Sequence, residues 1–490
     1  MSASLPHRGG LRSEPLVQPS GGVHAAILLG AGGFILIMGV AALYDPRFLT
    51  LFLAAGMALC LAVPVLRFPV FSSVAWLLVA GSSPEWWLAD MIGNDGMITA
   101  AVKVVGLGLV VLCIVRYGGR FDMFNPAFAF VAMYIVGFIH GLYPTLTALD
   151  STRSLIGSMA PYTFSFSRLS RRWCTAMINT TICIPTLIVV FGVVLAGAGI
   201  RPLFIELGGI RLEGSTHPAF LGGFAAAAIY AGLLELFRGG RSRYLWSIIV
   251  NYVILVLSGA RAPLFLAFMV TLITFVALRS EQFPLRRRIM PVLAGMLLLP
   301  VLVSIALGGS SAIRLFDMLS SENDASNMSG RDILWPYFEA AWQASPTFGW
   351  GVGAARMVLD PDSLVVKLLG TTAAHNEYLR MGVEGGYVGI FTLVTLMALW
   401  GWSHTRGAPR ADRFILRLVL IAFAIHSITD NTLIAGTASI LFTWFSATFA
   451  RIALEREDAA AEARRSRSEM AMAHDPRSGA QGGGEPAYVS

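Results

Sequence analysis

Long apolar runs separated by short polar segments dominate this chain. Each long run is predicted to be helical, because lipid offers no partner for an unpaired backbone amide. Runs of roughly membrane-spanning length occur at residues 23–43, 48–66, 69–84, 97–115, 124–143, 176–199, 219–237, 244–259, 262–278, 289–308, 386–403, 414–430 and 432–453. A weaker run lies at residues 151–167. The pattern predicts an all-α polytopic integral membrane protein with about 12–14 transmembrane helices.

Lysine and arginine in the short connections predict the orientation of these spans. Clusters lie at residues 238–243, 279–288, 406–413 and 451–467, and basic loops of this kind face the cytoplasm. The arginines at residues 116–120 and 168–172 fit the same side only if the run at 151–167 also crosses. We therefore expect about fourteen spans and both termini in the cytoplasm of a bacterial cell, with the protein in the inner membrane.

The pattern divides the chain into five parts, with one long loop on the periplasmic side. They are a tail (1–22), the first set of spans (23–308), the loop (309–385), the last spans (386–453) and a charged, Gly-rich tail expected to be disordered (454–490). The loop holds nine acidic and five basic residues, and an amphipathic helix is expected at 332–344. Loops of this length are usually functional, so we expect the chemistry here.

Composition agrees with a membrane protein, because 56% of residues are hydrophobic and only 13% are charged, against about 25% charged in soluble proteins. The net charge of +7 is concentrated in the cytoplasmic clusters, which argues against nucleic-acid binding. None of the four cysteines lies in the long loop, so a disulfide framework or a thiolate metal cage is not indicated.

Two arginines on the periplasmic side are candidate anion ligands. Arg261 lies in the turn Ser258-Gly259-Ala260-Arg261, where it could either extend to the lipid headgroups or bind a phosphate bidentately. Arg331 follows Gly330 inside the long loop, where an ion pair with Asp332 is the simpler alternative.

A histidine closes the long loop. His375-Asn376 precedes Gly382, Gly385, Gly386 and Gly389 as the chain re-enters the membrane. An imidazole titrates near neutrality and can accept a proton from a hydroxyl, although a structural histidine is the alternative reading. His426 and Asp430, at another periplasmic end, either line the same cavity or cap a helix.

The combination of these motifs resembles the O-antigen ligase and polysaccharide polymerase superfamily, the Wzy-like membrane glycosyltransferases, which have a GT-C-like architecture. The resemblance rests on the Ser-Gly-x-Arg turn, Gly330-Arg331-(x)3-Trp335, Phe348-Gly349-x-Gly351 and His375-Asn376-(x)9-Gly386. It implies that Arg261 and Arg331 hold a diphosphate, that Asn376 helps to bind substrate, and that His375 activates an acceptor hydroxyl. It also implies inverting transfer without a metal or another cofactor.

The resemblance leads us to expect a polymerase that joins glycan repeats carried on undecaprenyl diphosphate, for an exopolysaccharide or an O-antigen of lipopolysaccharide. The alternative is a ligase that transfers the glycan to a lipid A core or another acceptor. A glycolipid flippase is a third reading, disfavoured because few ionisable residues lie inside the spans. Expected partners are the lipid-linked donor, a glycan or lipid A core acceptor, the bilayer and, for a polymerase, a chain-length regulator.

Overall fold

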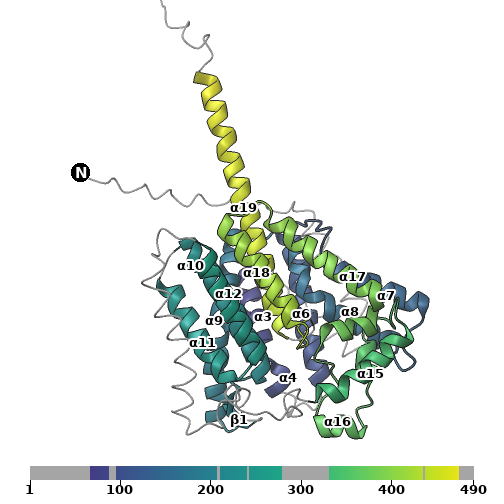
Figure 1. Cartoon of the computed structure of the whole chain (residues 1–490). Helices are drawn as coiled ribbons and strands as arrows, with labels where there is room; N and C mark the ends of the chain where they lie inside the picture. The colour runs from purple at the N-terminus through teal and green to yellow at the C-terminus, as the bar shows by residue number, and fades with distance from the viewer. Residues whose placement is uncertain are drawn as a thin grey trace, which may run out of the picture.

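The structure is a computed structural model that describes residues 67–87, 95–206, 210–239, 242–278, 330–433 and 436–473. The predicted spans at 23–43, 48–66 and 289–308 lie outside these residues. The described part is a bundle of helices with a single two-stranded hairpin (Figure 1).

Most of the described residues are helical. The α-helices are α3 (Pro69–Ser82), α4 (Pro84–Trp87), α6 (Asp95–Tyr117), α7 (Ala127–His140), α8 (Ala148–Met159), α9 (Arg171–Gly197), α10 (Pro218–Gly239), α11 (Ser242–Ser258), α12 (Arg261–Ala277), α15 (Arg331–Ala344), α16 (Leu364–Leu369), α17 (Glu377–Thr405), α18 (Arg410–His426) and α19 (Gly436–Ala473). The described part also contains two 3₁₀ helices, η1 (Ala160–Phe166) and η4 (Ala354–Met357). Its two strands, β1 (Phe204–Glu206) and β2 (Ile210–Leu212), pair antiparallel. The predicted all-α class is confirmed.

Length and apolar character identify the membrane-crossing helices. Among the described residues, α9, α10, α17 and α19 are long and apolar enough to cross a bilayer. Large apolar side chains such as Phe71, Ile139 and Phe265 are exposed, as expected where lipid replaces water. The most apolar stretches of α10 and α19 lie mostly inside the bundle. The prediction of a polytopic membrane protein is therefore confirmed.

Arg238 and the basic clusters at 406–413 and 451–467 meet at one end of the bundle, which we call the basic end. The cluster predicted at 279–288 lies outside the described residues. There Arg238 bridges Glu455 at 2.7 Å and also contacts Asp412. Arg451 pairs with Glu235 at 2.6 Å. These pairs fasten α10, α18 and α19 together at this end.

The weaker apolar run at 151–167 passes through the bundle as two consecutive helices, α8 and η1. Near its start, the Ser151 hydroxyl donates to the carbonyl of Val352 at 2.8 Å. Just after its end, the Arg168 amide donates to the carbonyl of Gly118 at 2.9 Å, beyond the last turn of α6. This path therefore connects the long loop with the region beyond the end of α6, and the predicted orientation of the spans stays a prediction.

The end opposite the basic end carries the β1–β2 hairpin, α15 and α16 (Figure 1). We call it the site end. The helix expected at 332–344 is α15, and it begins one residue earlier than predicted. The loop was predicted to run to residue 385, but α17 already begins at Glu377 because Asn376 caps it. The predicted boundary coincides with Gly386, whose φ of 59° and ψ of −161° interrupt the helix.

The prediction of a disordered tail from residue 454 is wrong as far as Ala473, because α19 continues to that residue. Figure 1 shows this extension projecting from the basic end. Its sequence is rich in Ala, Glu and Arg, which have high intrinsic helix propensity. These residues continue the helix beyond the last apolar turn.

Candidate functional site

His375 lies two residues before α17, and its backbone φ is +49°. Few residues other than glycine adopt this left-handed backbone conformation. Where they do, the residue often belongs to a ligand-binding or active site. Its Nε2 atom lies 3.4 Å from the Thr371 hydroxyl. The side chain is 36% exposed, so the imidazole is fixed but open to a substrate.

Asn376 caps the helix that carries the site. Its side-chain oxygen accepts the amide of Tyr378 at 2.9 Å and that of Leu379 at 3.2 Å. Replacing such a cap by alanine costs about 0.5–2 kcal/mol. The oxygen of Asn376 therefore positions His375 at the start of α17, and its predicted substrate contact stays a prediction.

Asp430, in the α18–α19 connection, brings two histidines together. Its carboxylate lies 3.7 Å from Nδ1 of His375 and 3.6 Å from Nε2 of His426, and it accepts the amide of Asn431 at 2.8 Å. Burial alone would raise the pKa of Asp430, but the two imidazoles and this amide lower it well below its usual range. The residue is a carboxylate at neutral pH. Of the two readings for His426 and Asp430, the structure favours the lining of a shared site.

The segment that carries Asp430 is tied to the start of α17. The Glu377 amide donates to the carbonyl of Ser427, and its side chain accepts the amide of Leu433, both at 2.8 Å. The separation between Asp430 and His375 is therefore set by hydrogen bonds of Glu377 to residues on both sides of Asp430.

Arg331 approaches the same segment from the long loop. It is the first residue of α15, and its Nη2 donates to the carbonyl of Thr429 at 2.8 Å. Its Nε is buried and has no hydrogen-bond partner among the described residues. Burial lowers the pKa of this guanidinium, and the charge of Asp430 opposes that effect. The structure thus brings two of the three predicted residues, Arg331 and His375, to the α18–α19 connection.

His217, which the sequence did not single out, lies near this group. Its ring packs 5.1 Å from that of Trp86, and its Nδ1 accepts the amide of Ala219 at 3.3 Å. Burial, aided by Arg211, lowers the pKa of His217 to about 4 despite the opposing charge of Asp430. A neutral imidazole therefore borders the site. The only signal in the sequence was a histidine directly before the proline that begins an apolar run.

Arg261 is the first residue of α12, and the turn before it packs against the first turns of α10. A Cβ on Gly222 of α10 would lie 2.3 Å from Cβ of Ala260 and 3.0 Å from the Ser258 hydroxyl. Gly259, with φ of +64°, lies against the side chain of Arg211. Arg261 therefore shares the site end with His217, and Arg211 is a further cation there that the sequence did not reveal.

The glycine motifs hold the long loop against α17. The amides of Trp350 and Gly351 donate to the carbonyls of Val383 and Glu384 at 2.8 and 2.9 Å. A Cβ on Gly349 would lie 2.5 Å from the Glu384 backbone, and one on Gly386 would lie 2.4 Å from that of Thr347. The backbone of the long loop lies directly against the backbone of α17 at these two positions, so a side chain larger than that of glycine would not fit.

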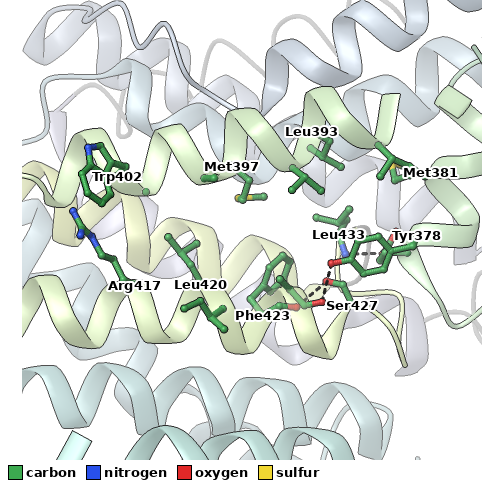
Figure 2. Close-up of a pocket in the computed structure, with 17 residues that line it drawn as sticks. Tyr378, Met381, Leu393, Met397, Trp402, Arg417, Leu420, Phe423, Ser427 and Leu433 are labelled. Atoms are coloured by element: carbon green, nitrogen blue, oxygen red, sulfur yellow. Dashed lines mark hydrogen bonds between the residues drawn. The ribbon is translucent and has the colours of Figure 1, made fainter. Parts of the chain in front are cut away.

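An apolar groove of about 300 Å³ runs between α17 and α18, beginning beside the site. Figure 2 shows Met381, Leu393 and Met397 facing Leu420 and Phe423 across it. Tyr378 and Ser427 lie at one end, and Trp402 and Arg417 at the other. From Ile390 to Trp402 alone, α17 rises about 18 Å. The groove can hold a long hydrocarbon chain.

The described residues contain no group of three or more His, Cys, Asp and Glu side chains that could hold a metal ion. The groups gathered at the site are imidazoles, guanidiniums and one ionised carboxylate. This set can bind an anion and accept a proton.

Comparison with protein families identifies one region of the chain. Residues 245–394 match the family model described as O-Antigen ligase. No curated protein matches the chain. The matched range includes Arg261, Arg331 and His375, and it ends within α17.

Proposed function

We propose that this chain, whose residues 245–394 match the O-Antigen ligase family model, transfers a glycan from undecaprenyl diphosphate to an acceptor hydroxyl at the periplasmic face of the inner membrane. The observation that carries the proposal is the approach of His375 and Arg331 to the Asp430 segment, at the mouth of an apolar groove. Such a site suits a substrate with a charged head and a hydrocarbon tail.

His375 is the general base in this proposal. The acceptor oxygen attacks the anomeric carbon while its proton passes to the imidazole. The bond between that carbon and the diphosphate oxygen breaks, and the configuration inverts. Asp430, which lies on the Nδ1 side of the ring, stabilises the imidazolium and holds Nε2 toward the acceptor.

Arg331 and Arg261 bind the diphosphate and offset the charge that grows on it as it leaves. Guanidinium groups match phosphate oxygens bidentately. In a partly dehydrated site their attraction for that charge exceeds its value in bulk water. The buried Nε of Arg331, without a partner among the described residues, is a donor available to such a ligand.

The groove between α17 and α18 receives the polyprenyl tail. Tyr378 and Ser427 border its end nearest Asp430, so a lipid lying in the groove presents its diphosphate to the site. Apolar side chains line the rest of its length. This arrangement supports a lipid-linked donor over a soluble nucleotide sugar.

We propose polymerisation of glycan repeats as the reaction, with ligation to a lipid A core or another acceptor as the alternative. Both reactions use the same donor chemistry and differ in the acceptor. Deletion of the gene separates them on a glycan gel. Loss of a polymerase leaves single repeats, whereas loss of a ligase leaves long chains that are not attached to core.

Reconstituted full-length protein with undecaprenyl-diphosphate-linked glycan tests the proposal itself. The His375→Ala variant should lose transfer while the His140→Gln variant keeps it, since His140 is an exposed histidine at the site end. Movement of the glycolipid across the vesicle membrane without any new glycosidic bond would favour a flippase and contradict the proposal.

A further inference from the structure

A second cavity, of about 520 Å³, lies at the site end between α6, α8, η4 and α17. It is separate from the groove, because α17 presents Met381 to the groove and Arg380 to this cavity. Four basic residues line it, against two acidic ones: Lys103, Arg153, Arg356 and Arg380, with Asp150 and Glu384. None of the four basic residues has a role in the proposed reaction.

Arg380 supplies a buried donor to this cavity. Its side chain is only 6% exposed. Nε contacts Glu377, and Nη1 lies 3.2 Å from a carboxylate oxygen of Glu384. Nη2 is buried and has no hydrogen-bond partner among the described residues. Leaving such a charged donor unsatisfied is costly, so an acceptor inside the cavity would be favoured.

The other three cations come from three different elements. Lys103 projects from α6 so that its Nζ lies 3.1 Å from the place a Cβ of Gly157 would take. Arg153 of α8 and Arg356 of η4 are exposed. Gly353, with φ of +96°, brings the start of η4 against Ser154 of α8. The fold therefore holds cations from α6, α8, η4 and α17 around one space.

Two exposed apolar residues that line the cavity indicate a ligand that comes from the membrane. Val104 and Leu149 line the cavity and are also exposed, by 54% and 78%. In a membrane protein such apolar residues face lipid. Arginine forks favour phosphate oxygens, and the volume is within the range of about 300–1,000 Å³ that binds small molecules.

We infer that this cavity binds the phosphate or diphosphate headgroup of a lipid, at a site separate from His375. Its deepest contact is the Nη2 atom of Arg380, and Arg153 and Arg356 close on the headgroup from either side. The lipid tail leaves the cavity past Val104 and Leu149. If the proposed function holds, on which this step rests, the ligand is the second substrate, because the donor occupies the groove on another face of α17.

Native mass spectrometry of the full-length protein with added undecaprenyl diphosphate tests the inference by counting bound lipids. The wild type should bind two. The double variant Arg153→Ala/Arg356→Ala should still bind one lipid tightly. Its affinity for the second lipid should fall by about tenfold for each arginine lost. The matched control Arg171→Ala/Arg172→Ala removes two exposed arginines at the basic end and should still bind two. Equal melting temperatures would show that the variants fold.

The outcomes separate this inference from the proposed function. Arg331→Ala should remove the other lipid; if it does not, the donor site is wrong while the cavity stands. Wild type with one lipid, unchanged by Arg153→Ala/Arg356→Ala, would overturn the inference. So would equal occupancy by undecaprenol, which lacks the charged head. Inorganic pyrophosphate should displace the lipid only at much higher concentrations than that of the lipid. Displacement at equal concentrations would show that the cavity binds a free anion, and this would overturn the assignment to a lipid.

Discussion

Nδ1 of His375 lies 3.7 Å from Oδ1 of Asp430, although the two residues belong to different connections of the bundle. An ionised carboxylate behind an imidazole orients the ring and stabilises its protonated form. The pairing gives the proposed base a partner whose connection is held by hydrogen bonds to Glu377. His375 is thus positioned by both its own helix start and the α18–α19 connection.

Asp430→Asn should lower the turnover of reconstituted enzyme without abolishing it. The amide keeps the shape of the side chain but cannot stabilise an imidazolium, so part of the about 10²–10⁴-fold contribution of a positioned base is lost. The substrate KM should change little, because Asp430 is not expected to contact the diphosphate. A large rise in KM with unchanged turnover would contradict this role.

The thermal stability of Asp430→Asn provides a second test. The pKa of Asp430 is lower in the folded chain than in the unfolded one, so its ionisation stabilises the fold above the unfolded value of about 3.9. That contribution is lost as the pH falls toward the folded value. The wild type should therefore melt at a higher temperature than the variant at pH 7. This difference in melting temperature should shrink below about pH 4. A difference that is independent of pH would contradict the pairing.

Arg331→Lys should rescue activity poorly. Lysine keeps the positive charge but lacks the planar fork, and loss of one charge-assisted hydrogen bond costs about tenfold or more in kcat/KM. Arg331→Ala should be worse still. The matched substitution Arg172→Lys, at an exposed residue of the basic end, should leave kcat/KM unchanged. Full activity in Arg331→Lys would mean that only net charge matters.

His217 should make the fold sensitive to mild acid. Its pKa of about 4 in the folded chain lies below the unfolded value of about 6.5, so the unfolded chain binds the proton more readily. Stability should therefore fall as the pH drops from about 6.5 to about 4. His217→Asn can keep the contact with the Ala219 amide but does not titrate, and it should flatten this loss. Melting curves across this range check the prediction, which fails if both proteins respond alike.

Filling the groove should discriminate between lipid chain lengths. Met397→Trp places a large ring between α17 and α18, opposite Leu420 (Figure 2). Transfer from the undecaprenyl-linked donor should weaken, while a donor with a much shorter isoprenoid tail should be affected less. Phe391→Trp is the control, because Phe391 is on the same helix but exposed to lipid. Equal losses for both donors would show that the tail does not lie there.

The apolar runs and the placement of Lys and Arg were enough to predict the helical bundle and to place the candidate site residues at one end of it. Arg261, Arg331 and His375 each lie at or just before a helix start, and the order of the spans sends these starts to one end. The contact of His375 with Asp430 and the proximity of His217 could not be predicted. They depend on how α10 and the α18–α19 connection pack, which no local pattern encodes.

The helix-capping role of Asn376 was not anticipated. Its side-chain oxygen accepts two amides at the start of α17, and the substrate contact expected from the family resemblance stays a prediction. Asparagine directly before a glutamate-led apolar helix is a typical cap, so the signal was present. The tail beyond residue 454 was expected to be disordered because it is charged, yet high helix propensity extends α19 to Ala473.

Chemical rescue of His375→Ala tests the central claim most directly. Removal of the imidazole should reduce transfer from the undecaprenyl-diphosphate donor by about 10²–10⁴-fold, and added free imidazole should restore part of the rate as its concentration rises. The restored rate should increase with pH as the added imidazole loses its proton. A His375→Ala enzyme that transfers glycan at the wild-type rate would show that this histidine is not the base.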